Sequence, residues 1–131
     1  ELGRSFRIYE TCNGIRVIGK KYLDPSASNF TRIMRALNVD FTYSTLCRKQ
    51  KCYRARLTPK PYRMKIETIK IQSPLDCGTS NYQAWSRMYH SESKAYSVVK
   101  LLETIGEDFA SDKTIQFHDQ TANAAENQKL V

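Results

Sequence analysis

The sequence predicts an α+β domain in which a small antiparallel sheet is covered on one face by helices. Three observations support this: a hairpin signal at Asn13-Gly14, an alternating basic segment at Tyr53–Thr58, and a helical repeat of apolar residues over Asn81–Ile105. The chain has 131 residues, which is the length of one domain. We expect residues 1–110 to form this domain, and residues 111–131 to form a partly ordered C-terminal extension with a weaker apolar pattern.

The first predicted element is a β-hairpin over residues 6–20. Asn-Gly is a strong hairpin signal, because a type I′ turn needs a positive φ at both central residues. With Asn13-Gly14 as the loop, Cys12 faces Ile15. The face expected to meet the core contains Phe6, Ile8, Glu10, Cys12, Ile15, Val17 and Gly19. The face expected to be open and basic contains Arg7, Tyr9, Thr11, Arg16, Ile18 and Lys20.

Two short helices are predicted next. Apolar residues repeat at helical spacing from Phe30 to Leu37, and Asn38 is expected to end this helix in the left-handed conformation. Asp40 is expected to cap a second short helix that continues through Leu46.

A basic strand is predicted over Tyr53–Thr58, because apolar and polar residues alternate there and place Arg54 and Arg56 on one face. Pro59 and Pro61 are expected to end it, since neither can donate to a strand ladder. Residues 64–72 are predicted to form either a further strand or a short helix.

The longest predicted element is a helix over Asn81–Ile105. Its helical stripe consists of Tyr82, Trp85, Met88, Tyr89, Tyr96, Val99, Leu102 and Ile105. Gly106 is expected at the C′ position of this helix, where glycine is favoured. Much of the core is therefore expected to come from this segment.

Positive charge is concentrated in one stretch, CRKQKCYRARLTPKPYRMK (residues 47–65), which holds eight Lys or Arg and no Asp or Glu. The net charge is +8; residues 1–70 hold sixteen basic against five acidic residues, and residues 71–131 hold five against eight. This asymmetry predicts one face built for a polyanion, most often nucleic acid. One alternative is that the arginines form only a solvated surface. The other is that they pair internally with acids such as Glu92, Glu103, Glu107 and Asp108.

The four cysteines, Cys12, Cys47, Cys52 and Cys77, are expected to be reduced in a cytoplasmic protein, because their density is low. Two disulfides in a secreted chain are the alternative, and the Asn29-Phe30-Thr31 sequon agrees with it. A zinc site using Cys47 and Cys52 with Cys77 and a histidine is disfavoured by the four-residue spacing and the lack of nearby glycines. We therefore predict no metal and no cofactor.

No catalytic residue is predicted. The chain has two histidines, and His118 next to Asp119 is not expected to form a dyad, because sequence neighbours point apart. Acid–base cleavage of RNA would suit a basic protein with histidines, but no motif identifies it. No apolar run is long enough to span a membrane and no signal peptide is visible. The chain opens with Glu1, so we expect a processed form or a piece of a longer protein.

The stretches FRIYETCNGIRVI, LNVDFTYSTLC, CYRARLTPKPYR and YSVVKLLETIGEDFASDKTIQFHDQTA resemble an uncharacterised bacterial protein family without an established activity. A fainter resemblance, carried by the Gly-x-Arg hairpin, the helix and the basic strand, is to the RRM-like palm of archaeo-eukaryotic primase-polymerases. That resemblance implies contact with nucleotides or nucleic acid at Arg16, Arg54 and Arg56. Primase-polymerases carry a paired acidic metal motif, and this sequence shows no such pair.

Taken together, the patterns predict a non-catalytic domain that binds nucleic acid, DNA or RNA, on a basic sheet face. Tyr9 is expected to stack on bases and the cations to contact phosphates. The predicted site residues are Arg7, Tyr9, Arg16, Arg54, Arg56, Lys60 and Arg63. Two alternatives stay open: a primase-like or nuclease enzyme fragment that lacks its acidic metal motif, and an interaction module for an acidic protein. The oligomeric state is not predicted.

Overall fold

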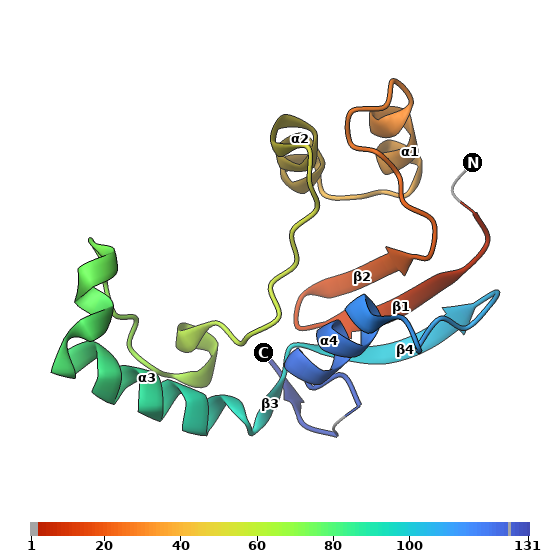
Figure 1. Cartoon of the computed structure of the whole chain (residues 1–131). Coiled ribbons are helices and arrows are strands. Elements are labelled where there is room, and N and C mark those ends of the chain that lie inside the picture. The colour runs from red at the N-terminus through yellow and green to blue at the C-terminus, as the bar shows by residue number, and fades with distance from the viewer. Residues whose placement is uncertain (1–2, 126) are drawn as a thin grey trace.

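The computed structural model describes residues 3–125 and 127–131 and confirms the α+β class (Figure 1). Its main sheet is antiparallel in the order β2-β1-β4, built from β1 (Phe6–Thr11), β2 (Gly14–Gly19) and β4 (Val99–Ile105). The helices are α1 (Phe30–Ala36), α2 (Phe41–Gln50), α3 (Ser80–Ser93) and α4 (Lys113–Thr121). The short 3₁₀ helices are η1 (Pro61–Met64) and η2 (Pro74–Gly78). Two further short strands, β3 (Tyr96–Ser97) and β5 (Lys129–Leu130), pair in parallel.

The N-terminal hairpin is confirmed, but its turn lies one residue earlier than predicted. Thr11 pairs with Gly14, so the loop residues are Cys12 and Asn13, and neither Asn13 nor Gly14 has a positive φ. The Thr11 hydroxyl donates to the Gly14 carbonyl over 3.0 Å, which closes this turn without the type I′ geometry. The pairing shifts by two residues, so every side chain keeps its predicted face.

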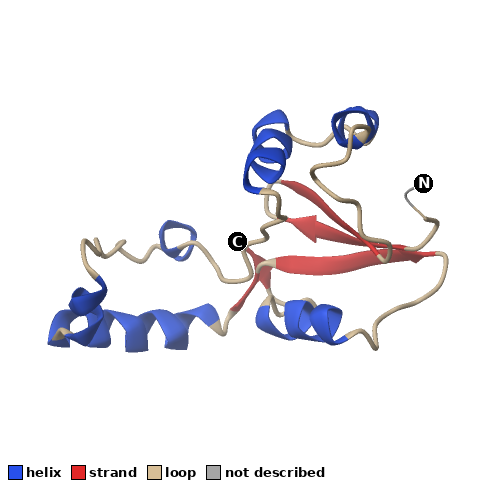
Figure 2. Cartoon of the chain, turned by 45° about the horizontal axis from the view of Figure 1, so that its top comes forward, coloured by secondary structure: helices blue, strands red, loops and turns tan. Residues whose placement is uncertain are grey.

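The sheet buries the face that was expected to be open. Tyr9 is 0% exposed and Arg7 is 4% exposed, whereas Ile15 and Val17 on the opposite face are more than half exposed. Helix α4 lies against the Arg7 and Tyr9 face (Figure 2), and Tyr9 packs there in a cluster with Val98, Val99, Ala122, Ala124 and Ile18. The prediction of an open basic sheet face is therefore wrong for Arg7 and Tyr9.

The predicted helix over residues 81–105 is also corrected. Helix α3 begins at Ser80, after the Thr79 cap, and ends at Ser93, and the chain then forms β3 and β4. Strand β4 pairs with β1 along its length, with a bulge between Ile8 and Tyr9 in the register. Gly106 has the expected positive φ of 74°, but it ends a strand, where a Cβ would lie 2.3 Å from the carbonyl oxygen of Arg4.

The predicted basic strand is absent among the described residues. Residues 53–60 contain no helix or strand and join no sheet, and the same holds for residues 65–72. The two prolines are part of the reason: Pro59 cannot donate to a ladder, and Pro61 starts the η1 turn. The third strand of the sheet is instead β4.

Helices α1 and α2 form their own cluster, in which Phe30, Met34 and Cys47 are buried against Leu23 and Val39. The predicted ends hold: Asn38 has a φ of 53°, and the Asp40 carboxylate accepts from the amide of Tyr43 over 2.7 Å. The second helix is longer than predicted and reaches Gln50.

A third cluster joins α3 to η1 and to the last residue of the chain. Tyr89 is buried with Met64, Ile66 and Val131, and Trp85 stacks on Tyr89 with ring centroids 5.1 Å apart. Residues 111–131, expected as an extension, thus supply α4 on the sheet, β5 beside β3, and a buried C-terminal valine.

Candidate nucleic-acid interface

Arg7 lies at the centre of a charged network between β1 and α4. Its Nη1 lies 3.0 Å from Oδ1 of Asp108, and its Nη2 lies 2.8 Å from Oδ2 of Asp119. Its Nε donates to the Tyr9 hydroxyl over 2.8 Å, and that hydroxyl donates to Oδ1 of Asp119 over 2.8 Å. The alternative of internal pairing therefore holds for Arg7, with Asp108 among the acids named for it and Asp119 outside that set.

Burial changes the proton affinities of this network. Burial is the main reason that the pKa of Tyr9 rises to about 12, and the nearby Asp119 carboxylate raises it further. For Arg7, burial acts to lower the pKa, but the hydrogen bond to Tyr9 and the charge of Asp119 outweigh it, and the pKa is raised. Both groups hold their protons at neutral pH, so the network keeps one buried positive charge between two carboxylates.

His118 and Asp119 do contact each other, contrary to the expectation from their adjacency. Nδ1 of His118 lies 2.8 Å from Oδ1 of Asp119, at the C-terminal end of α4. The two side chains converge because both reach toward the buried Tyr9, whose ring centroid lies 4.9 Å from that of His118. The contact fixes the orientation of the His118 ring, and the residue is only 5% exposed.

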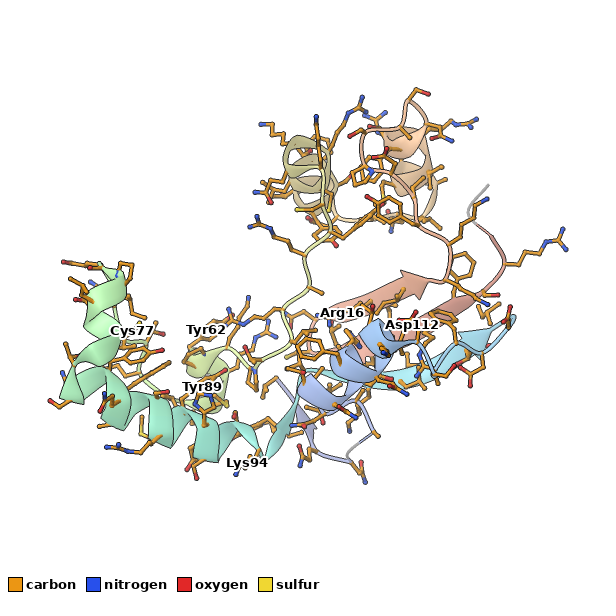
Figure 3. The ribbon with its side chains drawn as sticks, viewed as in Figure 1. Arg16, Tyr62, Cys77, Tyr89, Lys94 and Asp112 are labelled. Atoms are coloured by element: carbon orange, nitrogen blue, oxygen red, sulfur yellow. The ribbon has the colours of Figure 1, made fainter. Side chains whose placement is uncertain are left out.

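Arg16 joins the sheet to the basic segment, which we define as residues 54–63. One guanidinium nitrogen, Nη1, lies 3.0 Å from Nε2 of His118, and the other, Nη2, donates to the carbonyl oxygen of Arg56 over 2.9 Å. Burial lowers the pKa of Arg16. Figure 3 shows Arg16 at the sheet beside α4. Of the sheet-face residues predicted from sequence, Arg16 is the half-buried one that reaches the basic segment.

The basic segment itself follows the surface. Arg54 and Arg56 are exposed, and Nε of Arg56 donates to the carbonyl oxygen of Thr58 over 3.0 Å. With the Asn13 amide oriented to donate to the Cys12 carbonyl, its Oδ1 accepts from Arg63 over 2.9 Å, which holds the segment at the hairpin tip. Tyr89 adds a bond from α3 to the carbonyl oxygen of Pro59, over 2.7 Å.

Tyr62 lies within this segment, on the η1 turn (Figure 3), and its side chain is 62% exposed. Lys60 Nζ lies 5.8 Å and Arg63 Cζ lies 5.9 Å from its ring centroid. A hydrogen bond from Arg63 lowers the pKa of the Tyr62 hydroxyl, and the Lys60 charge adds to this. The result is an exposed aromatic ring with two cationic groups within 6 Å of its centroid.

Sequence reasoning missed Tyr62, although its position between Lys60 and Arg63 was a usable signal. It also missed the role of Asp119 in the buried network, because Arg7 and Tyr9, which contact its carboxylate, lie more than a hundred residues earlier in the chain. The structure thus brings together Arg16, Arg56 and Arg63 around the hairpin tip, adds Tyr62, and removes Arg7 and Tyr9 from the surface.

Within residues 3–125 and 127–131, no group of three or more His, Cys, Asp or Glu side chains is placed to hold a metal ion. The four cysteines are free; Cys47 is buried between α1 and α2, and Cys12 and Cys77 are exposed. None of the described helices has the length and apolar character needed to cross a bilayer.

No protein-family model, curated protein or solved structure matches the chain.

Proposed function

We propose that this chain binds single-stranded nucleic acid along the basic segment, with Tyr62 in place of Tyr9 as the stacking residue. The observation that carries the proposal is the exposed ring of Tyr62 with the cationic groups of Lys60 and Arg63 close to it. Aromatic side chains next to cations are the usual means of binding single strands, because bases stack on the ring while the cations contact phosphates. The resemblance to primase-polymerases agrees with this choice at Arg16, Arg54 and Arg56.

The distribution of ion pairs supports a role beyond solvation. Arg7 pairs with two carboxylates, and Lys20 pairs with Glu107 at 2.5 Å. Across the described part of the chain, no ion pair involves Arg54, Arg56, Lys60 or Arg63. Such a cluster repels itself unless an external anion neutralises it.

A salt titration tests the proposal with an oligonucleotide of mixed sequence and fluorescence anisotropy. About five phosphate contacts on a single strand predict a slope of log K against log salt near −3.5, at roughly 0.7 per contact. The double variant Arg54→Ala/Arg56→Ala should flatten this slope by about 1.4. The matched double variant Arg32→Ala/Arg87→Ala, at exposed arginines on α1 and α3, should leave it nearly unchanged.

Stacking is tested at Tyr62. Replacement by Ala should weaken binding by about 1–3 kcal/mol with no change in slope, because stacking releases no counterions. Tyr62→Phe should retain affinity, and Phe117→Ala, at a ring that is 63% exposed on α4, serves as the control. If the segment instead serves an acidic protein partner and binds the oligonucleotide through charge alone, Tyr62→Ala should weaken oligonucleotide binding no more than Phe117→Ala does. Absence of binding at low salt, or equal slopes for the two arginine pairs, would reject the proposal.

A further inference from the structure

A groove of about 390 Å³ opens between α1 and α2, and Tyr62 is not among its lining residues. We propose that it binds a nucleotide, with the phosphate held by cations and the base placed against Phe41. The nucleotide can be free or can be the 5′-phosphorylated end of a strand, since both present the same chemistry. The volume of the groove lies in the lower part of the range for small-ligand sites, about 300–1,000 Å³.

One face of each helix lines the groove. On α1 and just after it, the lining residues recur at a spacing of three or four. The lining residues on α2 show the same spacing. The lining residues are Thr31, Met34, Arg35, Asn38, Val39, Phe41, Ser44, Thr45, Arg48 and Lys49. Three of these ten residues are cationic, none is acidic, and four carry a hydroxyl or amide group. The lining therefore favours an anion that can also accept neutral hydrogen bonds.

Arg48 is held in position across the groove. Its Nη1 donates to the hydroxyl of Thr31 over 2.6 Å, which joins α2 to α1 and fixes the guanidinium. A guanidinium has five N–H groups, so most remain for a phosphate. No ion pair involves Arg35, Arg48 or Lys49 among the residues that the structure describes.

The apolar part of the lining suits a ring. Met34 is buried at the interface of the two helices, whereas Phe41 at the start of α2 is strongly exposed. An exposed aromatic ring at the edge of a cationic groove provides a stacking surface for a base, together with phosphate contacts nearby. An inorganic anion would leave this ring without a partner.

A simpler explanation is that the three cations only offset the dipoles of the two helices, because each lies in a last turn. That effect needs no groove and does not require the absence of carboxylates from all ten lining positions. It also does not explain why Phe41 is exposed at the same groove. Only the proposed site predicts that a nucleotide binds in the groove; compensation of the helix dipoles predicts no such binding.

The test is a heteronuclear NMR titration of the whole chain with adenosine monophosphate, adenosine and inorganic phosphate as separate probes. We expect the monophosphate to shift amide signals from both helices, and the other two probes to bind at least tenfold more weakly. Arg35→Ala and Arg48→Ala should each weaken monophosphate binding by about tenfold or more. Arg32→Ala is the matched control, because Arg32 is an exposed neighbour on α1 outside the lining.

The proposal is overturned if the monophosphate shifts no groove signals, or if Arg32→Ala and Arg35→Ala weaken binding equally. Unfolding transitions of all variants exclude loss of the fold as the cause. Displacement of the monophosphate by a 5′-phosphorylated oligonucleotide, but not by its 5′-hydroxyl form, identifies a strand end as the occupant; displacement by neither identifies the free nucleotide. Tyr62→Ala should leave monophosphate binding unchanged, so this site and the basic segment can succeed or fail independently.

Discussion

Nη1 of Arg16 lies 3.0 Å from Nε2 of His118, while Nδ1 of the same ring lies 2.8 Å from Oδ1 of Asp119. A guanidinium can only donate, so Nε2 must accept and Nδ1 must carry the ring proton. We predict the Nδ1–H tautomer for His118 near neutral pH. Nitrogen-15 NMR of the imidazole, with the signal assigned by its loss in His118→Ala, measures this directly. A proton on Nε2 would mean that Arg16 does not donate to His118 in solution.

The two carboxylates that contact Arg7 should contribute unequally to stability. Asp119 is 23% exposed and also accepts from Tyr9, whereas Asp108 is 66% exposed. Asp119→Asn should cost about 3–5 kcal/mol, because it leaves a buried guanidinium poorly compensated. Asp108→Asn should cost less than about 1 kcal/mol, as is typical of an exposed partner. Denaturant titration compares the two, and equal losses would contradict the burial of the network.

Alkaline pH should destabilise the fold through Tyr9. The folded chain keeps the Tyr9 proton to a pKa of about 12, whereas the unfolded chain releases it near 10. The unfolded state therefore binds fewer protons in this window, so stability is complete below pH 10 and falls as the pH rises toward 12. The loss is at most about 3 kcal/mol for two pKa units. Burial also raises the pKa values of Tyr43 and Tyr53 to about 12.

Tyr9→Phe separates these contributions, because it removes only the Tyr9 titration and keeps the other two. The free energy of unfolding should then fall less steeply with pH between 10 and 12 than in the unmodified chain. Identical slopes in the two proteins would show that the Tyr9 hydroxyl is not buried in solution.

Val99 and Leu102 distinguish the strand from the helix that the sequence suggests. In β4, Val99 is 0% exposed and Leu102 is 54% exposed, although a helix would place both on one stripe. Val99→Ala should cost about 2 kcal/mol, at roughly 0.8 kcal/mol per buried methylene plus a small cavity. Leu102→Ala should change stability by less than about 0.5 kcal/mol. Similar losses at both positions would favour the helix.

Local signals predicted the elements whose causes are local. The Asp40 cap, the left-handed Asn38 and the alternation of the hairpin depend on neighbouring residues, and the structure contains all three. Residues 99–105 satisfy a helical period and also contain β-branched residues, so the choice between helix and strand required knowledge of β1. Pairing across about ninety residues overrides local preference there.

The buried face of the hairpin was mispredicted for a similar reason. Its apolar content favours burial of the face with Ile15 and Val17. Helix α4 instead covers the face with Arg7 and Tyr9, because the carboxylates of Asp108 and Asp119 accept hydrogen bonds from those two side chains. Those acids cannot be assigned to Arg7 from the hairpin sequence. The strand predicted over residues 53–58 is wrong for a local reason, since the prolines that follow it cannot donate to a strand ladder.

The placement of β1 between β2 and β4 has a consequence for synthesis of the chain. The hairpin can close as soon as residues 6–19 leave the ribosome, but its second neighbour begins at Val99, and the partners of Arg7 follow at Asp108 and Asp119. At typical translation rates of about 5–20 residues per second, the edge of β1 that later pairs with β4 stays unpaired for several seconds. Contacts of such large sequence separation also slow folding. The N-terminal strand therefore completes its pairing only when most of the chain has emerged.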